Sequence, residues 1–322
     1  MSDLHKTTVA VVILNWNGWH DTLACVRSVL THAPDAQIVV CDNASSDGSY
    51  DHLKAALSSE LPAGALCCLQ SVDHSPQPVE AHVVLIQNGA NLGFAGGCNI
   101  GLRFALRQQH GYFWLLNNDT EIEPGALDEL LQRMADDSQI GMCGSRLVYF
   151  DTPEVVQARG GATYDPTTGV GQHLGVHESV DAIEDPEAIE ADMDYVVGAS
   201  MLVSRRFVEL VGLMQEDYFL YFEELDWATR GRACGFRLGY APRSVVRHRE
   251  GASIGSSHQG PGSMLSLRYL SRNRLLYTQR FHPQYLGSVR RRMLFETLVY
   301  AKRRQWSAAK VVLQSLFVKR QG

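Results

Sequence analysis

The sequence has no apolar run of the length that a membrane-spanning helix needs. Residues 1–8 include Asp3, His5 and Lys6, where a signal peptide would have an apolar segment. The seven cysteines form no CxxC pair, and most of them lie in apolar segments. This use of cysteine is typical of a reducing compartment, so we expect a globular protein of the cytoplasm.

The chain has no excess of positive charge, but its charges are unevenly distributed. A formal net charge of -6 over 322 residues argues against a nucleic-acid binder. Acidic residues are concentrated in 172–194, which we interpret as a solvated loop, and 58–82 has the composition of an irregular surface segment. From Met264 onward, the sequence predicts helices with interleaved basic and apolar residues. We therefore divide the chain into a domain over 1–260 and a basic helical extension over 261–322.

A basic amphipathic extension suits contact with an anionic membrane surface, here the inner face of the cell membrane. Its apolar residues suit equally well packing on the rest of the chain or on another subunit. We therefore keep two expectations for 261–322, peripheral membrane contact and a homo-oligomer.

Four unbroken apolar runs are typical of strands that are buried on both faces of a parallel sheet. These runs are residues 9–14, 38–41, 83–86 and 112–116. Between them, Leu23, Val26 and Leu30 have helical spacing, Ser49 suits the cap of a second helix, and Pro124 suits the first turn of another. The alternation predicts a doubly wound α/β sheet, in which ligands bind beyond the carboxyl ends of the strands.

The second half of the chain predicts further elements. Helices are expected over 205–211, capped by Ser204, and over 224–234. Two short strands, 236–240 and 245–248, are expected to follow.

Polar residues follow the first three predicted strands. Asn15 and Asn17 begin a turn directly after the first strand, and Asp42 stands at the tip of the second. A carboxylate at that position suits a base edge or a ribose hydroxyl, although an Asx turn also explains it. The glycine-rich segment 91–101 follows the third strand and offers free N–H groups to phosphate or ribose oxygens. It is not a GxGxxG motif, which counts against a dinucleotide enzyme.

Acidic residues and one histidine come later in the chain. Asp119 follows the fourth apolar run, where it could present an oxygen ligand to Mg²⁺ or Mn²⁺ or simply end the strand in a turn. His248 lies where the chain leaves a short strand, and Mn²⁺ accepts imidazole. Glu223, Glu224 and Asp226 stand beside aromatic residues. Apolar neighbours would raise the pKa of a carboxylate toward that of a general base, while the helix dipole is the structural explanation for acids at this place.

These motifs occur in an order that resembles the inverting family 2 glycosyltransferases of GT-A fold. Within them, the chain is most similar to the rhamnosyltransferase-like enzymes of bacterial surface-polysaccharide assembly. The motifs are VVILNWNG, VCDNASSDGS, NLGFAGGCNIG, LLNNDTEI, GASMLVSRRFVELVGLMQEDYFLYFEELDWATR and HREGAS. The resemblance covers about residues 9–253, and its specificity lies in the series. It implies a mixed, mostly parallel sheet flanked by helices, followed by a C-terminal helical extension.

The resemblance implies a nucleotide-diphosphate sugar as donor, with dTDP-rhamnose as the expected one, and a saccharide or lipid-linked saccharide as acceptor. The residues that it implies for binding the donor nucleotide are Asn15, Asn17, Asp42, Asn91, Gly93, Asn99 and Asn118. The segment that it implies beside the acceptor contains Gly198, Ala199 and Ser200.

The resemblance also implies a divalent cation, Mg²⁺ or Mn²⁺, and a catalytic base. Asp119 is similar to the final carboxylate of the family's DxD motif and His248 to its later metal ligand. Asn117 stands where many members have the first Asp, so this motif carries one less charge. Glu224 falls on the position of the base, where relatives often have Asp. The assignment therefore stays open among three acids, Glu223, Glu224 and Asp226.

The same residues are compatible with two other functions. A sugar-1-phosphate nucleotidylyltransferase also uses an α/β sheet and Mg²⁺, but it would have a Gly-rich loop with Arg or Lys where this chain has NWNG. A non-catalytic sugar-binding protein on the same fold would be expected to lose Asp119 or the three acids, and this chain retains them all.

Overall fold

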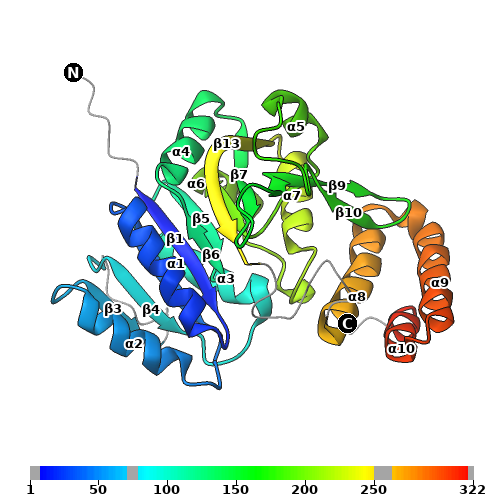
Figure 1. The fold of residues 1–322 in the computed structure, drawn as a ribbon, viewed down its shortest axis with the longest axis horizontal. Coiled ribbons are helices and arrows are strands. Elements are labelled where there is room, and N and C mark those ends of the chain that lie inside the picture. Colours follow the sequence, from blue (N-terminus) through cyan, green and yellow to red (C-terminus); the bar gives the residue numbers. More distant parts are fainter. Residues whose placement is uncertain (1–7, 71–78, 250–262, 318–322) are drawn as a thin grey trace.

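The computed structural model describes residues 8–70, 79–249 and 263–317. Within these ranges, ten strands form one sheet in the order β3-β4-β2-β1-β5-β12-β7-β13-β6, with β8 paired to β7 (Figure 1). The strands of this sheet are β1 (Val9–Asn15), β2 (Gln37–Asp42), β3 (Leu66–Leu69), β4 (Val83–Gln87), β5 (Tyr112–Asn117), β6 (Thr120–Ile122), β7 (Ile140–Tyr149), β8 (Val156–Arg159), β12 (Ser200–Ser204) and β13 (Arg237–His248).

The sheet is parallel on one side and mixed on the other. The five strands from β3 to β5 run parallel, β12 runs antiparallel to β5 and β7, and β13 runs parallel to β7. A second described sheet has the order β10-β9-β11, with β9 (Gly161–Asp165), β10 (Val170–His173) and β11 (Tyr195–Val196). The predicted mixed, mostly parallel sheet and its four apolar strands are confirmed.

Helices cover both faces of the main sheet, because the side chains of each strand alternate between two cores. On β1, Val11 and Ile13 belong to one core, and Ala10 and Val12 belong to the other. The first core receives α1 (Trp19–His32), α2 (Ser49–Glu60) and α4 (Ala126–Asp136). The second core receives α3 (Gly93–Arg107), α6 (Arg205–Val211) and α7 (Glu223–Ala233).

Three further helices follow residue 263 and lie at the end of the molecule away from α2 (Figure 1). They are α8 (Met264–Phe281), α9 (Leu286–Lys302) and α10 (Trp306–Ser315), with the short 3-10 helix η2 (Pro283–Tyr285) between the first two. The Arg274 Nε atom of α8 donates a hydrogen bond of 2.8 Å to the Thr168 carbonyl, in the turn between β9 and β10. The helical extension is therefore attached to the sheet domain by specific contacts. The boundary predicted at residue 260 lies outside the described residues and stays a prediction.

The composition of the acidic segment 172–194 predicts a solvated loop, but part of this segment has regular structure. It contains the end of β10 and a helix, α5 (Pro186–Asp192). Glu190 is buried, and it accepts hydrogen bonds of 2.8 and 2.6 Å from the Arg133 guanidinium of α4. Composition could not reveal this, because the compensating arginine comes from another part of the chain.

Smaller differences concern the ends of elements. The segment 58–82 contains β3, an edge strand whose apolar run is only four residues long. The strands predicted over 236–240 and 245–248 are one strand, β13, with an irregularity in its register after Ala241. Ser49 is the first residue of α2, and Gly48 in a left-handed conformation takes the cap position.

No helix in the described ranges is both long and apolar enough to cross a membrane.

Candidate active site

A cavity of about 860 Å³ opens beyond the carboxyl ends of the parallel strands. Leu14 and Asn117 line it from the ends of β1 and β5, and Asn91 lines it from the loop between β4 and α3. Its other walls come from the β9–β10 hairpin, from the segment before α7 and from helices α8 and α9. The position agrees with the expectation for an open α/β sheet, where ligands bind at this edge.

Two adjacent acids, Glu223 and Glu224, reach the cavity at the start of α7. The backbone before them is strained, since Phe219, Tyr221 and Phe222 have φ values of 66°, 66° and 77°. Bulky residues rarely adopt this left-handed conformation, and each instance costs about 1–3 kcal/mol. Strain of this kind persists where the surrounding structure holds it, and it is concentrated at functional sites.

Asn273 of α8 holds this strained segment. Its buried side-chain amide donates hydrogen bonds of 2.8, 2.8 and 3.0 Å to the carbonyl groups of Tyr218, Leu220 and Tyr221. The C-terminal extension therefore fixes the loop that presents both glutamates to the cavity.

The environment of the two glutamates favours their protonated forms. Burial raises the pKa of Glu224 to about 7 from its usual value of 4.5. Burial also raises the pKa of Glu223 well above that value, and the neighbouring charge of Glu224 adds to the shift. The Glu223 Oε2 atom is buried and has no hydrogen-bond partner among the residues that the structure describes. Of the two, Glu224 has the pKa that suits proton exchange near neutral pH.

Gly198 allows the Glu224 carboxylate to lie against the chain at the other wall of the cavity. A Cβ atom at residue 198 would lie 2.4 Å from Glu224 Oε1, which is closer than real Cβ contacts allow. Gly198 and Ala199 both line the cavity. Ser200 does not, because its hydroxyl accepts from Trp114 Nε1 at 3.0 Å inside the sheet. The predicted acceptor segment is thus divided between the cavity and the core.

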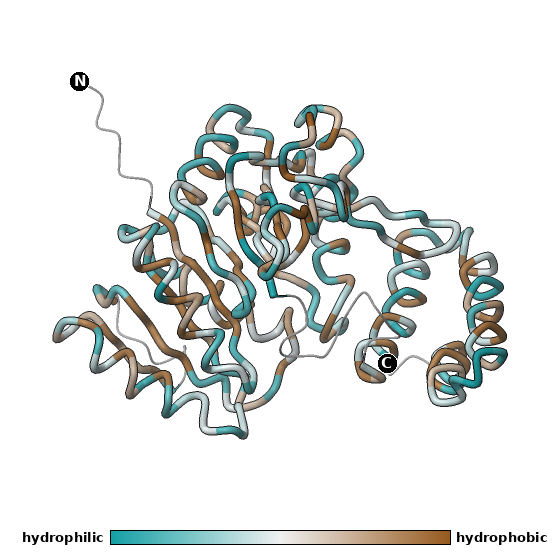
Figure 2. The backbone as a smooth tube through the Cα atoms, in the orientation of Figure 1, coloured by the Kyte–Doolittle hydropathy of each residue, from teal (hydrophilic) through white to brown (hydrophobic). Residues whose placement is uncertain are grey.

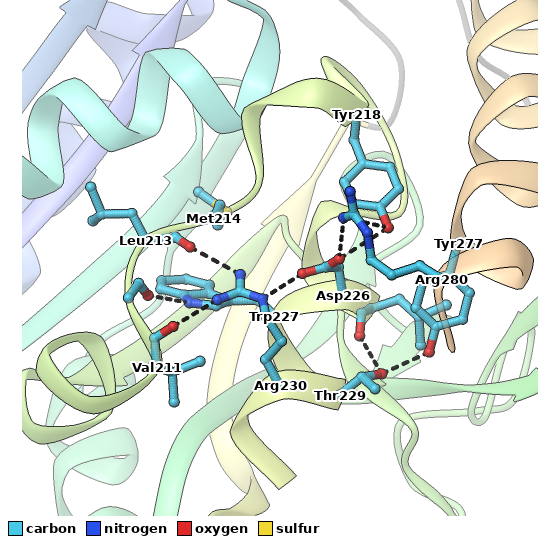
Figure 3. Close-up of polar contacts among 12 residues, drawn as sticks. Val211, Leu213, Met214, Tyr218, Asp226, Trp227, Thr229, Arg230, Tyr277 and Arg280 are labelled. Carbon is cyan, nitrogen blue, oxygen red and sulfur yellow. Dashed lines mark hydrogen bonds and ion pairs between the residues drawn. The ribbon is translucent and has the colours of Figure 1, made fainter. Parts of the chain in front are cut away.

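Asp226, the third predicted acid, does not line the cavity. Its Oδ1 atom accepts from Arg230 Nε at 2.6 Å, and its Oδ2 atom accepts from Arg280 Nη1 at 2.8 Å and from the Tyr218 hydroxyl at 3.0 Å (Figure 3). The side chain is fully buried, and the two arginines come from α7 and α8. Asp226 therefore connects α7 to the C-terminal extension, and the cavity receives only Glu223 and Glu224 of the three acids.

Asp119 and His248 are brought together by antiparallel pairing of β6 with β13, in which Thr120 is opposite His248. The Asp119 Oδ1 atom lies 3.2 Å from His248 Nε2, and both side chains are nearly buried at the cavity wall. The Nδ1 atom of His248 lies 2.7 Å from Gln157 Oε1, so this nitrogen donates to the amide oxygen. The lone pair of His248 Nε2 then points toward the Asp119 carboxylate, so two electron-rich atoms face each other. A positive charge between these two atoms, either a proton or a metal ion, would stabilise the arrangement.

This pair fits a divalent cation, because metal-binding histidines usually donate their second nitrogen to an oxygen acceptor. The described residues contain no group of three or more His, Cys, Asp and Glu side chains that could hold a metal. Asn117 contributes an amide, whose Nδ2 atom lies 3.4 Å from His248 Nε2, where an acid would have added a ligand. A cation here would have two protein ligands and would need further oxygens from a substrate.

The residues predicted to bind the donor nucleotide are divided between the cavity and the interior. Asn91, Gly93 and Asn118 line the cavity. Asn17 does not line it, and its Oδ1 atom accepts from the Ser46 amide at 2.8 Å.

The other predicted donor residues are buried in hydrogen-bond networks and do not line the cavity. Asp42 accepts from the Asn15 side chain at 2.6 Å and from Gln87 Nε2 at 3.0 Å, and its side chain is fully buried. Asn99 donates to the Met214 carbonyl at 2.9 Å and to Glu216 Oε1 at 2.9 Å. In the structure as described, these side chains hold the strand ends and α3 in place.

The family comparison identifies the region that contains much of this site. Residues 70–169 match the model described as glycosyl transferase family 2. This match covers 100 of the 322 residues, so that region is similar to a glycosyl transferase family 2 domain. The matched region contributes Asn91, Gly93, Asn118 and Asp119 to the cavity.

Two curated relatives agree with the family 2 domain. The hexosyltransferase Agl10 of low-salt glycan biosynthesis in Haloferax volcanii is 26% identical over 157 residues, which cover 48% of each chain. The chain thus spans about half the length of this relative. The N-acetylglucosaminyl-diphospho-decaprenol L-rhamnosyltransferase of Mycobacterium tuberculosis is 25% identical over 237 residues, which cover 67% of this chain and 75% of that one.

Solved structures similar to the family 2 domain show its fold. GalNAc-T7 with UDP, GalNAc and Mn²⁺ matches with a TM-score of 0.58 at 17% identity, over 88% of this chain and 52% of that one. The mannosyltransferase PcManGT from Pyrobaculum calidifontis, with GDP-Man and Mn²⁺, matches with a TM-score of 0.54 at 12% identity, over 96% of this chain and 85% of that one. The predicted GT-A fold is confirmed, and the match over 70–169 supports the predicted resemblance to family 2, while the roles of single residues stay predictions.

The sequence did not reveal several residues that line the cavity or support its side chains. Gln157 lies in a short strand whose sequence, VQAR, has no feature that points to His248. Tyr164 and Tyr195 line the cavity from the three-stranded sheet, and Arg274 and Tyr300 line it from α8 and α9. Only the tertiary contacts bring these residues to the cavity.

Proposed function

We propose that the protein transfers a sugar from a nucleotide-diphosphate donor to an acceptor hydroxyl, with inversion at the anomeric carbon. The observation that supports this proposal best is Glu224, a carboxylate with a pKa of about 7 in the cavity that Asp119 and His248 also line. A group with a pKa near the working pH is the most effective general base.

In the proposed reaction, Glu224 takes the proton of the acceptor hydroxyl while the hydroxyl oxygen bonds to the anomeric carbon. The bond from that carbon to the diphosphate oxygen breaks on the opposite face, and the nucleoside diphosphate leaves. Burial raises the pKa of Glu223 well above its usual value, and in its protonated form Glu223 would donate a hydrogen bond into the cavity, because its Oε2 atom is otherwise unsatisfied within the described structure. Aromatic side chains such as Tyr195 and Phe222 would keep water from the same position.

Asp119 and His248 would hold the divalent cation, with Gln157 fixing the imidazole. A cation at this point would supply charge that stabilises the leaving diphosphate. Both of the similar GT-A structures are complexes with Mn²⁺, which supports a cation in this role.

For the donor we propose dTDP-rhamnose, and for the acceptor a saccharide linked to a lipid diphosphate. The support is the mycobacterial relative, whose name specifies an L-rhamnosyltransferase acting on a decaprenol-linked sugar. Such an acceptor is anchored in a membrane, so the proposed location is the cytoplasmic face of the cell membrane.

The first experiment is a thermal-shift screen of dTDP-, UDP- and GDP-sugars with Mn²⁺ or Mg²⁺, followed by analysis of the product's anomeric configuration. We expect dTDP-rhamnose to give the largest shift. A shift with another donor alone would reject rhamnose, and a retained configuration would reject the proposed displacement. Release of pyrophosphate from a nucleoside triphosphate would instead indicate a nucleotidylyltransferase.

The second experiment tests the base. In Glu224→Gln we expect donor binding to persist and kcat to fall about 10²–10⁴-fold, as for the loss of a general base. Glu223→Gln serves as the matched variant, one residue away in the same cavity. If kcat falls with Glu223→Gln and persists with Glu224→Gln, the base is Glu223.

A further inference from the structure

Helix α9 has an apolar face in addition to the one that it buries. Val289 and Met293 pack against α10, and they lie on one side of the helix. On the opposite side, Leu294, Phe295 and Leu298 are 45%, 57% and 68% exposed. Their spacing of three and four residues keeps them on a single face. An amphipathic surface helix normally has polar residues on that side, so this face is suited to a contact outside the chain.

Helix α10 repeats this arrangement. Ala308 and Val312 are buried, whereas Trp306 and Leu313 are 66% and 41% exposed. Residues 306 and 313 are two helical turns apart and therefore share a face. Figure 2 shows hydrophobic positions along both helices, at the end of the molecule away from α2. We call the exposed side chains Leu294, Phe295, Leu298, Trp306 and Leu313 the apolar face of the extension.

Basic residues surround the apolar face, and no free acid accompanies them. The exposed basic residues of α9, of α10 and of their connection are Arg290, Arg291, Arg292, Lys302, Arg303, Arg304 and Lys310. Glu296 is the one acid in 286–315, a fully described range, and its carboxylate is paired with Arg274 at 2.9 Å and with Arg292 at 2.9 Å. The extension thus presents exposed apolar side chains within a positively charged border.

We infer that the apolar face of the extension docks on an anionic lipid membrane. Leucine and phenylalanine side chains would enter the boundary between headgroups and acyl chains, where Trp306 is also favourable. The arginines and lysines would contact the negatively charged headgroups. A second copy of the chain fits this face less well, because a two-fold contact would set the same basic residues against each other.

The docked helix would also lie next to the active site. Glu296 and Tyr300, on the side of α9 away from the apolar face, line the cavity that contains Glu224. One helix, about 10 Å across, would separate the membrane surface from the cavity. This inference extends the proposed function, since it gives a lipid-linked acceptor a short path to the base, but the test below needs no turnover.

The test is flotation of the full chain with vesicles, in the absence of donor and acceptor. One vesicle preparation contains phosphatidylcholine alone, and the other contains equal parts of phosphatidylcholine and phosphatidylglycerol. We expect binding to the second preparation. Leu298→Ser should weaken that binding about ten-fold, as expected for loss of a buried leucine, and Arg291→Gln should weaken it about five-fold.

Matched controls come from other surfaces of the same chain. Leu210 of α6 is 61% exposed, and Arg243 of β13 is exposed as well, so Leu210→Ser and Arg243→Gln should leave vesicle binding unchanged. All variants are surface substitutions, and thermal melting checks that each one folds. Absence of binding to anionic vesicles, or equal weakening by the control variants, would overturn the inference. A dimer that Leu298→Ser converts to a monomer, without vesicle binding, would assign the face to a second copy instead.

Discussion

The ends of the parallel strands and the start of α7 differ in how they satisfy buried polar groups. At the strand ends, Asp42 accepts four hydrogen bonds on its two oxygens, from Asn15, Gln87 and Ser45. At the start of α7, Glu223 has a buried oxygen without a partner in the described structure, and Glu224 has a raised pKa. A satisfied buried group stabilises the fold, whereas an unsatisfied one costs stability and is retained where it serves a ligand.

The same contrast exists within three neighbouring acids. Asp226 faces two guanidinium groups, while Glu223 and Glu224 face the cavity that Asp119 and His248 also line. Acids that look equivalent in the sequence thus have separate tasks. Asp226 holds the C-terminal extension, and the two glutamates are available for chemistry.

The largest effect on stability is expected from Asp226→Asn. The change removes the buried charge that compensates Arg230 and Arg280, and breaking such a pair costs about 3 kcal/mol. Urea unfolding at neutral pH would measure the loss. The matched control is Asp217→Asn, which removes an exposed partner of the same Arg280 and should cost less than about 1 kcal/mol. Equal effects of the two changes would contradict the structural role of Asp226.

Gly198→Ala is expected to lower kcat about 10²-fold while the fold persists. The added methyl group would displace the Glu224 carboxylate, and a catalytic group misplaced by about 1 Å loses this much activity. Steady-state kinetics with a melting curve would measure both effects. Gly212→Ala is the control, because a Cβ atom at residue 212 would meet no neighbouring atom. This substitution can affect stability only through the left-handed backbone conformation of residue 212, and we expect kcat to remain at the wild-type value.

Gln157→Ala is expected to weaken Mn²⁺ binding about ten- to hundred-fold. Without the amide oxygen, the His248 ring loses the partner that fixes its Nδ1–H, and loss of such partners costs metal sites this much affinity. Isothermal titration with Mn²⁺ in the presence of dTDP, the nucleotide of the proposed donor, would measure the affinity. Gln132→Ala, on the surface of α4, is the control. If Gln157→Ala binds Mn²⁺ as tightly as the wild type, the proposed role of His248 as a metal ligand would be rejected.

The smallest effect is a pH-dependent gain in stability from Glu224→Gln. The folded pKa of about 7 lies above the ordinary value of 4.5, so between these values the folded state holds a proton that the unfolded state has lost. The contribution of this carboxyl to stability is therefore lost as the pH rises through about 7. We expect the variant to be about 1–2 kcal/mol more stable than the wild type at about pH 8 and equally stable at about pH 4. Urea midpoints at both pH values would test it, with Glu209→Gln as an exposed control.

Sequence patterns predicted the fold better than the site. The runs that became β1, β2, β4 and β5 are continuous and apolar, so periodicity identified them. The short strand β3 and the helix α5 were missed, since a four-residue run and an acidic segment give no such signal. Asp119, His248 and Glu224 line one cavity, while the roles that the family resemblance implies for them stay predictions.

The sequence by itself determined the resemblance to family 2 and the parallel core of the sheet, because these depend on local order and on the identity of residues. Tertiary structure alone decided which acids face the cavity. Burial and pairing depend on residues distant in the chain, such as Arg280 beside Asp226 and Gln157 beside His248. It also decided that α8 holds the strained catalytic loop and that α9 exposes a second apolar face, since a helix acquires an inside and an outside only when it packs.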